Sequence, residues 1–141
     1  MAHYALQRDV VALYGSELLV RVADLDHDDQ PDPDVVEAGL QAADDIINAY
    51  LSAKYTVPVT SVSGALRKCA IDIGIYTMAQ EVTSRTEEMR RRYEDALAML
   101  KLMAAGSIGL GLPPVDNDGD GIPDSNPNMR KSARIITVSR I

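Results

Sequence analysis

The sequence has 141 residues, a length that predicts one domain. It contains 21 acidic and 14 basic side chains, and the resulting formal net charge of −7 at pH 7 argues against nucleic-acid binding as the main activity. No apolar run approaches the length of a transmembrane helix, and the N-terminus lacks the pattern of a secretory signal, so we expect no membrane association. The single cysteine, Cys69, excludes an internal disulfide and suits a reducing compartment.

Two short helices are predicted near the N-terminus. The first spans about residues 5–14, ends at Gly15, and has one apolar face formed by Leu6, Val10, Leu13 and Tyr14. Ser16 is a suitable N-cap for the second, over about residues 16–25. The acidic loop that follows ends in Asp32-Pro33, which combines an N-cap residue with a proline at the first helical position.

Three longer helices follow. The third is expected from about Pro33 to Lys54, the fourth over 63–82 after a connector that contains Pro58, and the fifth from the N-cap Thr86 to the C-cap Gly106. In the fifth helix, Glu87 with Arg91 and Glu88 with Arg92 have the spacing of ion pairs. The apolar stripes are Val36, Leu40, Ala43, Ile47, Tyr50 and Leu51 in the third helix, Leu66, Ala70, Ile73 and Thr77 in the fourth, and Met89, Tyr93, Ala96, Leu100 and Met103 in the fifth.

The character of the chain changes after Gly106. Residues 107–128 are rich in Gly, Pro, Asn and Asp, and a short β-prone run, 135–138, follows them. A lone strand is unstable in water, so it must pair with a strand of this chain or of another. The predicted fold is mainly α: a small bundle of about five helices, residues 1–106, with an extended C-terminal arm, residues 107–141, that carries a short β-strand.

The chemically reactive residues do not combine into a catalytic motif. The only histidines are His3, near an end expected to fray, and His27, in the acidic loop, and no nucleophile elbow, phosphate loop or zinc spacing is present. Cys69 is interpreted as a buried thiol, and the adjacent Asp44 and Asp45 as a solvated helix face. We therefore expect no enzyme and no required cofactor.

Two aspartate loops have the ligand spacing of the first part of a calcium loop. The later one offers these groups: Asp116, Asp118, Asp120, the carbonyl of Ile122, and Asp124. Its twelfth position is Pro127 instead of a bidentate Glu, so this is not an EF-hand. A solvated turn without metal is the alternative.

The earlier loop offers a second, less favoured set of metal ligands at the same relative positions: Asp24, Asp26, Asp28 and Asp32. Asp29 stands where a glycine would permit the sharp turn. An acidic loop that starts a helix is therefore the preferred interpretation.

Several segments in order resemble one known family. They are "RDVVALYGSELLVRVAD", "DVVEAGLQAADDIINAYLSAKYTVPV", "LRKCAIDIGIYTM" and "EEMRRRYEDALAMLKLMAAGSIGLGL". Over about residues 4–112 the chain resembles the Mu-like bacteriophage and prophage head–tail connector (adaptor) proteins. Asp29 departs from the glycine frequent in the family, and the arm beyond Leu112 lies outside the shared pattern.

The resemblance implies a structural role in the virion. Such adaptors form a ring, usually of twelve copies, between the portal protein and the stopper or tail-completion protein. The genomic DNA would pass through the channel without specific binding. The expected location is the head–tail neck of the virion, after assembly in the cytoplasm of the bacterial host. The alternative function is a calcium-binding regulatory or interaction module that uses the aspartate loops.

Two basic segments are the candidate contacts. The arm is expected to bind the portal or a neighbouring subunit through Arg130, Lys131, Arg134, Ile135, Ile136, Val138, Arg140 and Ile141. Alternatively its strand pairs with residues 107–112 of the same chain. Arg90, Arg91 and Arg92 of one subunit are candidates to face the acid-rich segment 24–45 of the next, or else they pair within their own helix.

Overall fold

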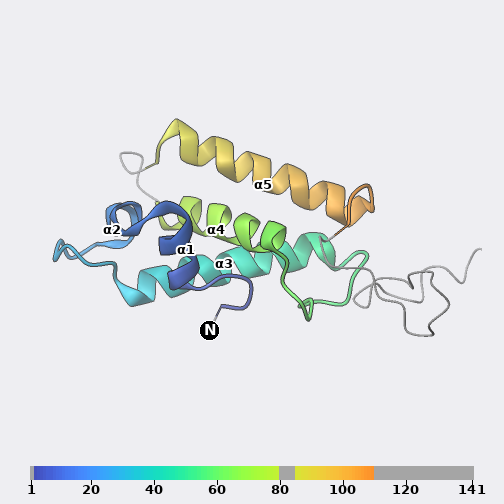
Figure 1. Cartoon of the computed structure of the whole chain (residues 1–141), viewed down its shortest axis with the longest axis horizontal. Coiled ribbons are helices and arrows are strands. Elements are labelled where there is room, and N and C mark those ends of the chain that lie inside the picture. The colour runs from blue at the N-terminus through green and yellow to red at the C-terminus, as the bar shows by residue number, and fades with distance from the viewer. Residues whose placement is uncertain (1, 80–84, 110–141) are drawn as a thin grey trace, which may run out of the picture.

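The computed structural model describes residues 2–79 and 85–109, which form five helices (Figure 1). These are α1 (Gln7–Tyr14), α2 (Ser16–Ala23), α3 (Pro33–Leu51), α4 (Gly64–Met78) and α5 (Glu87–Ala105). No β-strand occurs within these two ranges, and the mainly α prediction is confirmed for them. The predicted C-terminal strand and the aspartate loop at 116–124 lie outside the described residues. Among the helices described, none is long and apolar enough to cross a membrane.

The three long helices lie side by side along the long axis of the body, and α4 lies between α3 and α5 (Figure 1). Residues 69–75 of α4 are all buried, which explains why this helix has no single polar face. Helices α3 and α4 approach closely at Gly39 and Gly74. A Cβ atom added at Gly39 would lie 2.5 Å from Cγ of Met78, so this crossing excludes a larger residue without local repacking.

Most helix ends follow the predicted capping chemistry. The hydroxyl of Thr86 accepts a hydrogen bond from the backbone N–H of Met89 in α5, as predicted. Ser63, which was predicted only to begin the fourth helix, caps α4 in the same way. Gly106 ends α5 in the left-handed conformation, with φ of 80°. The prediction for Ser16 is wrong: Gly15, with φ of 90°, is the N-cap of α2 as well as the C-cap of α1. A glycine accommodates this positive φ, so the chain turns between the two helices one residue earlier than predicted.

The predicted helix ends differ from the observed ones in several places: α1 begins at Gln7 instead of residue 5, and α2 ends at Ala23 instead of residue 25. Helix α3 ends at Leu51 instead of Lys54, and α4 ends at Met78 instead of residue 82. Most of the predicted apolar stripes are buried, but Leu13 of α1 is 45% exposed. Helix α1 has eight residues, of which Val10 is the buried one, so only part of its predicted apolar face reaches the core.

The N-terminal segment is held against α3, and the prediction that His3 lies at a frayed end is wrong. The Asp44 carboxylate accepts hydrogen bonds from the backbone N–H of His3 at 2.6 Å and of Tyr4 at 3.1 Å. The hydroxyl of Tyr4 donates to Asn48 at 2.6 Å and accepts from the backbone N–H of Val59 at 3.1 Å. The prediction of a solvated helix face is therefore wrong for Asp44, which anchors the N-terminal segment, whereas Asp45 is exposed as predicted.

Candidate functional site

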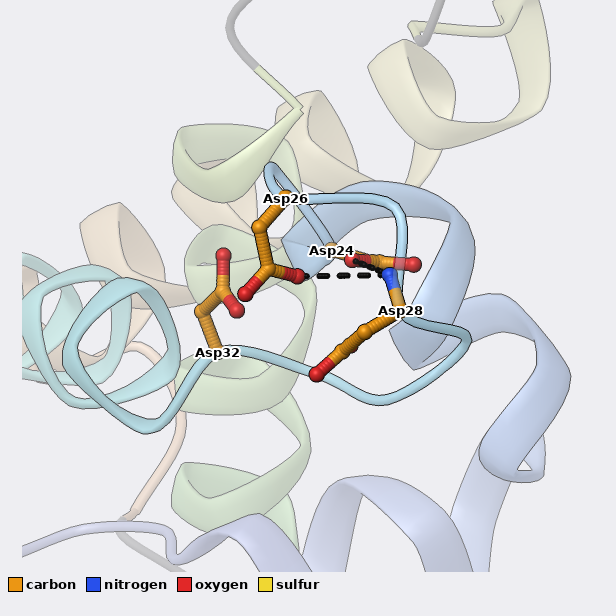
Figure 2. A group of neighbouring side chains, drawn as sticks. All are labelled: Asp24, Asp26, Asp28 and Asp32. Atoms are coloured by element: carbon orange, nitrogen blue, oxygen red, sulfur yellow. Dashed lines mark hydrogen bonds between the residues drawn. The ribbon is translucent and has the colours of Figure 1, made fainter.

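Four carboxylates converge in the loop between α2 and α3 (Figure 2). Asp24, Asp26, Asp28 and Asp32 each place one carboxylate oxygen within 4.8 Å of the others. These are the four residues of the earlier aspartate loop, which the sequence analysis rated below the later one. Their grouping in space makes this acidic cluster the candidate metal site of the described chain.

Backbone hydrogen bonds hold the loop in this shape. The carboxylate of Asp24 accepts from the N–H of Asp29 at 2.9 Å and of Asp28 at 3.2 Å. Asp32 accepts from the N–H of Leu25 at 2.9 Å, so its side chain closes the loop instead of capping α3. Its own N–H donates to the carbonyl of Ala23 at 2.8 Å. The side chains that would bind a cation are thus positioned by the loop's own backbone.

The sharp turn that a calcium loop needs is present without a glycine. Asp29 occupies the left-handed region with φ of 65°, and His27 does so with φ of 60°. Aspartate is among the non-glycine residues that adopt this conformation most readily. The sequence argument that Asp29 prevents the turn is therefore wrong.

The carboxylates influence one another's protonation. A hydrogen bond shared with Asp24 raises the pKa of Asp26, and desolvation and repulsion from Asp28 and Asp32 raise it further. For Asp24, desolvation acts to raise the pKa, but the hydrogen bonds from the backbone of Asp29 and Asp28 outweigh it and the pKa is lowered. Crowded anionic oxygens of this kind are stabilised by a bound cation or by a basic partner.

The ligand set suits a hard divalent cation, but it is incomplete as a calcium loop. Carboxylate oxygens are the ligands that Ca²⁺ prefers, and the spacing corresponds to positions 1, 3, 5 and 9 of the calcium loop. At position 12 stands Val35, a partly buried residue of α3 that cannot serve as the bidentate ligand. Weak calcium binding and a loop that only starts α3 both remain compatible with this arrangement.

The arginine group of α5 is largely paired within its own helix. Arg90 contacts Glu87 at 2.6 Å and Glu94 at 3.1 Å, and Arg92 contacts Glu88 at 2.6 Å. The predicted pair of Glu88 with Arg92 is confirmed, whereas Glu87 pairs with Arg90 instead of Arg91. Arg91 makes no ion pair with any residue that the structure describes.

Asp72, a buried acidic residue of α4, was not predicted from the sequence. The side chain of Asp72 is 3% exposed, accepts a hydrogen bond from the hydroxyl of Tyr14 at 2.5 Å, and contacts Nζ of Lys68 at 2.7 Å. Arg92 lies over the ring of Tyr14, at 4.3 Å from its centre. This polar group joins α1, α4 and α5. The i,i+4 spacing of Lys68 and Asp72 was its only sequence signal.

Cys69 is buried, as predicted, and burial raises the pKa of its thiol to about 11. The other candidate residues lie outside the described ranges. These are the later aspartate loop, Asp116, Asp118, Asp120, Ile122 and Asp124, and the basic arm, Arg130, Lys131, Arg134, Ile135, Ile136, Val138, Arg140 and Ile141.

Comparison with known proteins finds one family and two relatives. The model of the family described as Bacteriophage Mu, Gp36 matches residues 4–124. The Mu-like prophage FluMu protein gp36 of Haemophilus influenzae is 29% identical over 133 residues, which cover 94% of this chain and 91% of the relative. Gene product J of Escherichia phage Mu is 29% identical over 112 residues, which cover 78% of this chain and 77% of that protein.

Proposed function

Because the chain belongs to the Bacteriophage Mu Gp36 family, and is therefore a Mu-like phage protein, we propose that it is a structural protein of the virion that forms a ring between the portal and the tail. The observation that carries the proposal is the match over residues 4–124, which includes every helix of the described body. The ring would extend the DNA channel from the portal and would receive the stopper or tail-completion protein on its other face.

The distribution of charge supports this role. No basic residue occurs between residues 22 and 53, a stretch that includes the acidic cluster and all of α3. An acidic wall repels the phosphates of DNA over about one Debye length, roughly 10 Å at 0.1 M salt. A channel of this kind would let the genome pass without holding it.

Basic residues that lack an ion-pair partner within the described residues are the candidates for contacts between neighbouring subunits of the ring. Arg91 is exposed and free of ion pairs within the described residues, so it is the best of the three arginines to meet an acidic neighbour. Arg90 and Arg92 would have to exchange existing partners, which makes their contribution smaller. The basic arm would bind the portal or a neighbouring subunit, and the portal contact would depend on residues 126–141.

The ring is tested with the full chain and the portal of the same phage. Native mass spectrometry and cryo-electron microscopy of the co-expressed proteins should show a closed oligomer, with twelve copies expected, stacked on the portal. Purified virions should carry the protein at the neck by immunogold labelling. A protein that is missing from virions, or that stays monomeric beside assembled portals, would contradict the proposal.

The acidic cluster supports a second candidate, a calcium-regulated interaction module. Its four convergent carboxylates are the specific observation in favour. Treatment with EDTA distinguishes the two functions. A connector ring should form with or without the chelator, whereas a calcium-regulated module should change its affinity for its partner when calcium is removed. Calorimetric titration of the full chain with CaCl₂ tests binding directly, and a chain without heat of binding at millimolar calcium would exclude the second function.

A further inference from the structure

A groove runs beside the acidic cluster at the end of the body where α3 begins. It has a volume of about 750 Å³ and is formed by α2, the acidic loop, the first turns of α3 and the last turn of α4. Val22, Val35 and Met78 contribute apolar surface to it. Leu25, at its edge, is 65% exposed, the largest exposed fraction among the big apolar side chains described. The lining mixes apolar with charged and polar side chains, and the exposed Leu25 offers its apolar edge to a partner that carries aliphatic side chains.

The surroundings of this groove are strongly acidic. Asp24 and Asp34 line it, together with Arg21 and His27. The remainder of the acidic loop adds further carboxylates next to Asp24, and these converge instead of pairing with basic side chains (Figure 2). A partner for this groove should therefore combine aliphatic residues with positive charge.

Residues 130–141 of this chain have that composition. The segment "RKSARIITVSRI" contains four basic residues and no acidic one. It also carries four branched aliphatic side chains: Ile135, Ile136, Val138 and Ile141. The body on which the groove lies is acidic, so the chain contains both halves of a complementary pair.

The groove and the exit of the arm lie at opposite ends of the body. The groove uses Asp34 and Ala38, in the first turns of α3. The described chain ends at residue 109, shortly after Gly106, which packs against the side chain of Lys54 beyond the other end of α3. The helical segment from Ala38 to Leu51 alone corresponds to about 20 Å of helix. A segment that leaves one end and binds the other end of a second copy makes a head-to-tail contact, which repeats around a closed ring.

We propose that residues 130–141 of one copy bind in the α2–α3–α4 groove of the next copy. The aliphatic side chains would cover Leu25 and the apolar floor, and the basic side chains would face the acidic loop. The proposal rests on the proposed ring, because it supplies the contact that links consecutive subunits. It assigns the arm to a neighbouring subunit and not to the portal.

The proposal is tested by crosslinking two differently tagged full-length chains that are co-expressed. One carries Ala38→Cys, an exposed position in the groove, and the other carries Ile136→Cys in the arm. The native Cys69 is buried and reacts slowly with a maleimide because its pKa is raised to about 11. A short bis-maleimide should give a heterodimer band that contains both tags. Ala98→Cys, an exposed position of α5 outside the groove, is the matched control and should give little of this band.

Three outcomes would overturn the assignment. One is equal crosslinking at Ala38 and Ala98. Another is a crosslink within one chain as the main product when Ala38→Cys and Ile136→Cys are combined in the same chain, which would place the arm in the groove of its own chain. The third is the absence of a crosslink in assembled rings. Because the last result leaves the ring intact, failure of the arm assignment is distinguished from failure of the proposed function.

Charge variants give an independent measurement. A labelled peptide of residues 126–141, titrated with full-length protein, should bind two- to fivefold more weakly for each of Asp24→Asn and Asp34→Asn, the range expected for exposed ion pairs. Asp45→Asn, also exposed on α3 but outside the groove, is the control and should leave the affinity unchanged. Equal effects at all three positions would show only general attraction to an acidic body and would contradict a defined site.

Discussion

Tyr14→Phe should destabilise the protein through the buried carboxylate of Asp72. The hydroxyl of Tyr14 donates to this carboxylate at 2.5 Å, and the other carboxylate oxygen contacts Lys68 at 2.7 Å. Phenylalanine keeps the ring, including its contact with Arg92, and removes only the donor. In the variant, the Asp72 carboxylate, whose side chain is 3% exposed, keeps only Lys68 as a charged partner, and the side chain of Lys68 is 57% exposed.

The magnitude follows from the kind of hydrogen bond that is lost. A hydrogen bond to a charged group contributes about 1.5–3 kcal/mol, and the ring of Tyr14 is only partly buried, so we expect about 2 kcal/mol. For a domain of this size the corresponding fall in Tm is roughly 8 °C. Lys68→Met should cost less, about 1 kcal/mol or below, because its ammonium group is largely solvated.

Thermal and urea unfolding of the full chain measure the effect. Tyr93→Phe is the matched control: Tyr93 stacks on Tyr76 at 4.1 Å, and its hydroxyl makes no hydrogen bond within the described residues. The control should stay within about 0.5 kcal/mol of the native chain. If Tyr14→Phe were equally mild, or if a double-mutant cycle with Asp72→Asn gave no coupling, the reasoning about the buried carboxylate would be refuted.

Three further predictions concern protonation, metal binding and backbone geometry. Burial raises the pKa of Tyr4 and Tyr55 above the ordinary 10.0, so these phenols ionise at lower pH in the unfolded chain than in the folded one. The free energy of unfolding should therefore fall as the pH rises above about 10, and urea titrations from pH 9 to 11 measure this fall. If the acidic cluster holds calcium, Asp28→Asn should weaken calcium binding roughly tenfold or more, whereas Asp45→Asn should leave the calorimetric titration unchanged. Gly106→Ala should cost about 1 kcal/mol and lower Tm by roughly 4 °C, because φ there is 80°; an unchanged Tm would contradict this.

Local chemistry made the helix ends predictable from sequence. Thr86 and Gly106, the predicted caps of α5, act through groups within a few residues, so the signal and its effect lie in the same short window. The apolar stripes of α3 and α5 were predictable for the same reason, since helical periodicity is a local property.

Contacts between distant segments were not predictable in this way. The role of Asp72 could not be predicted from sequence, because its partner Tyr14 lies 58 residues away along the chain. His3 looked free because the groups that hold it belong to α3 and to the connector after it. Buried polar groups need partners from several elements, and only the folded chain shows which elements meet.

The acidic cluster shows that one of the two arguments against a metal site at the earlier aspartate loop had a wrong physical basis, whereas metal binding there stays a prediction. Its ligand positions were evident from sequence, but the missing glycine was taken to prevent the turn. Asp29 adopts the required positive φ, and its N–H is held by the carboxylate of Asp24. The loop thus uses one of its own acidic side chains to stabilise the turn that a glycine would otherwise permit.

The calcium hypothesis and the arm hypothesis require the same negative charge. Asp24 belongs to the acidic cluster and also lines the groove, so a bound divalent cation would cancel part of the charge that attracts the arm. The two ligands are therefore expected to oppose each other unless the cation also changes the shape of the loop. Loss of the crosslink between Ala38→Cys and Ile136→Cys chains on adding calcium, with recovery in EDTA, would indicate that the cluster acts as a switch on the contact between subunits. A crosslink that does not respond to calcium would mean that the cluster serves only to attract the arm.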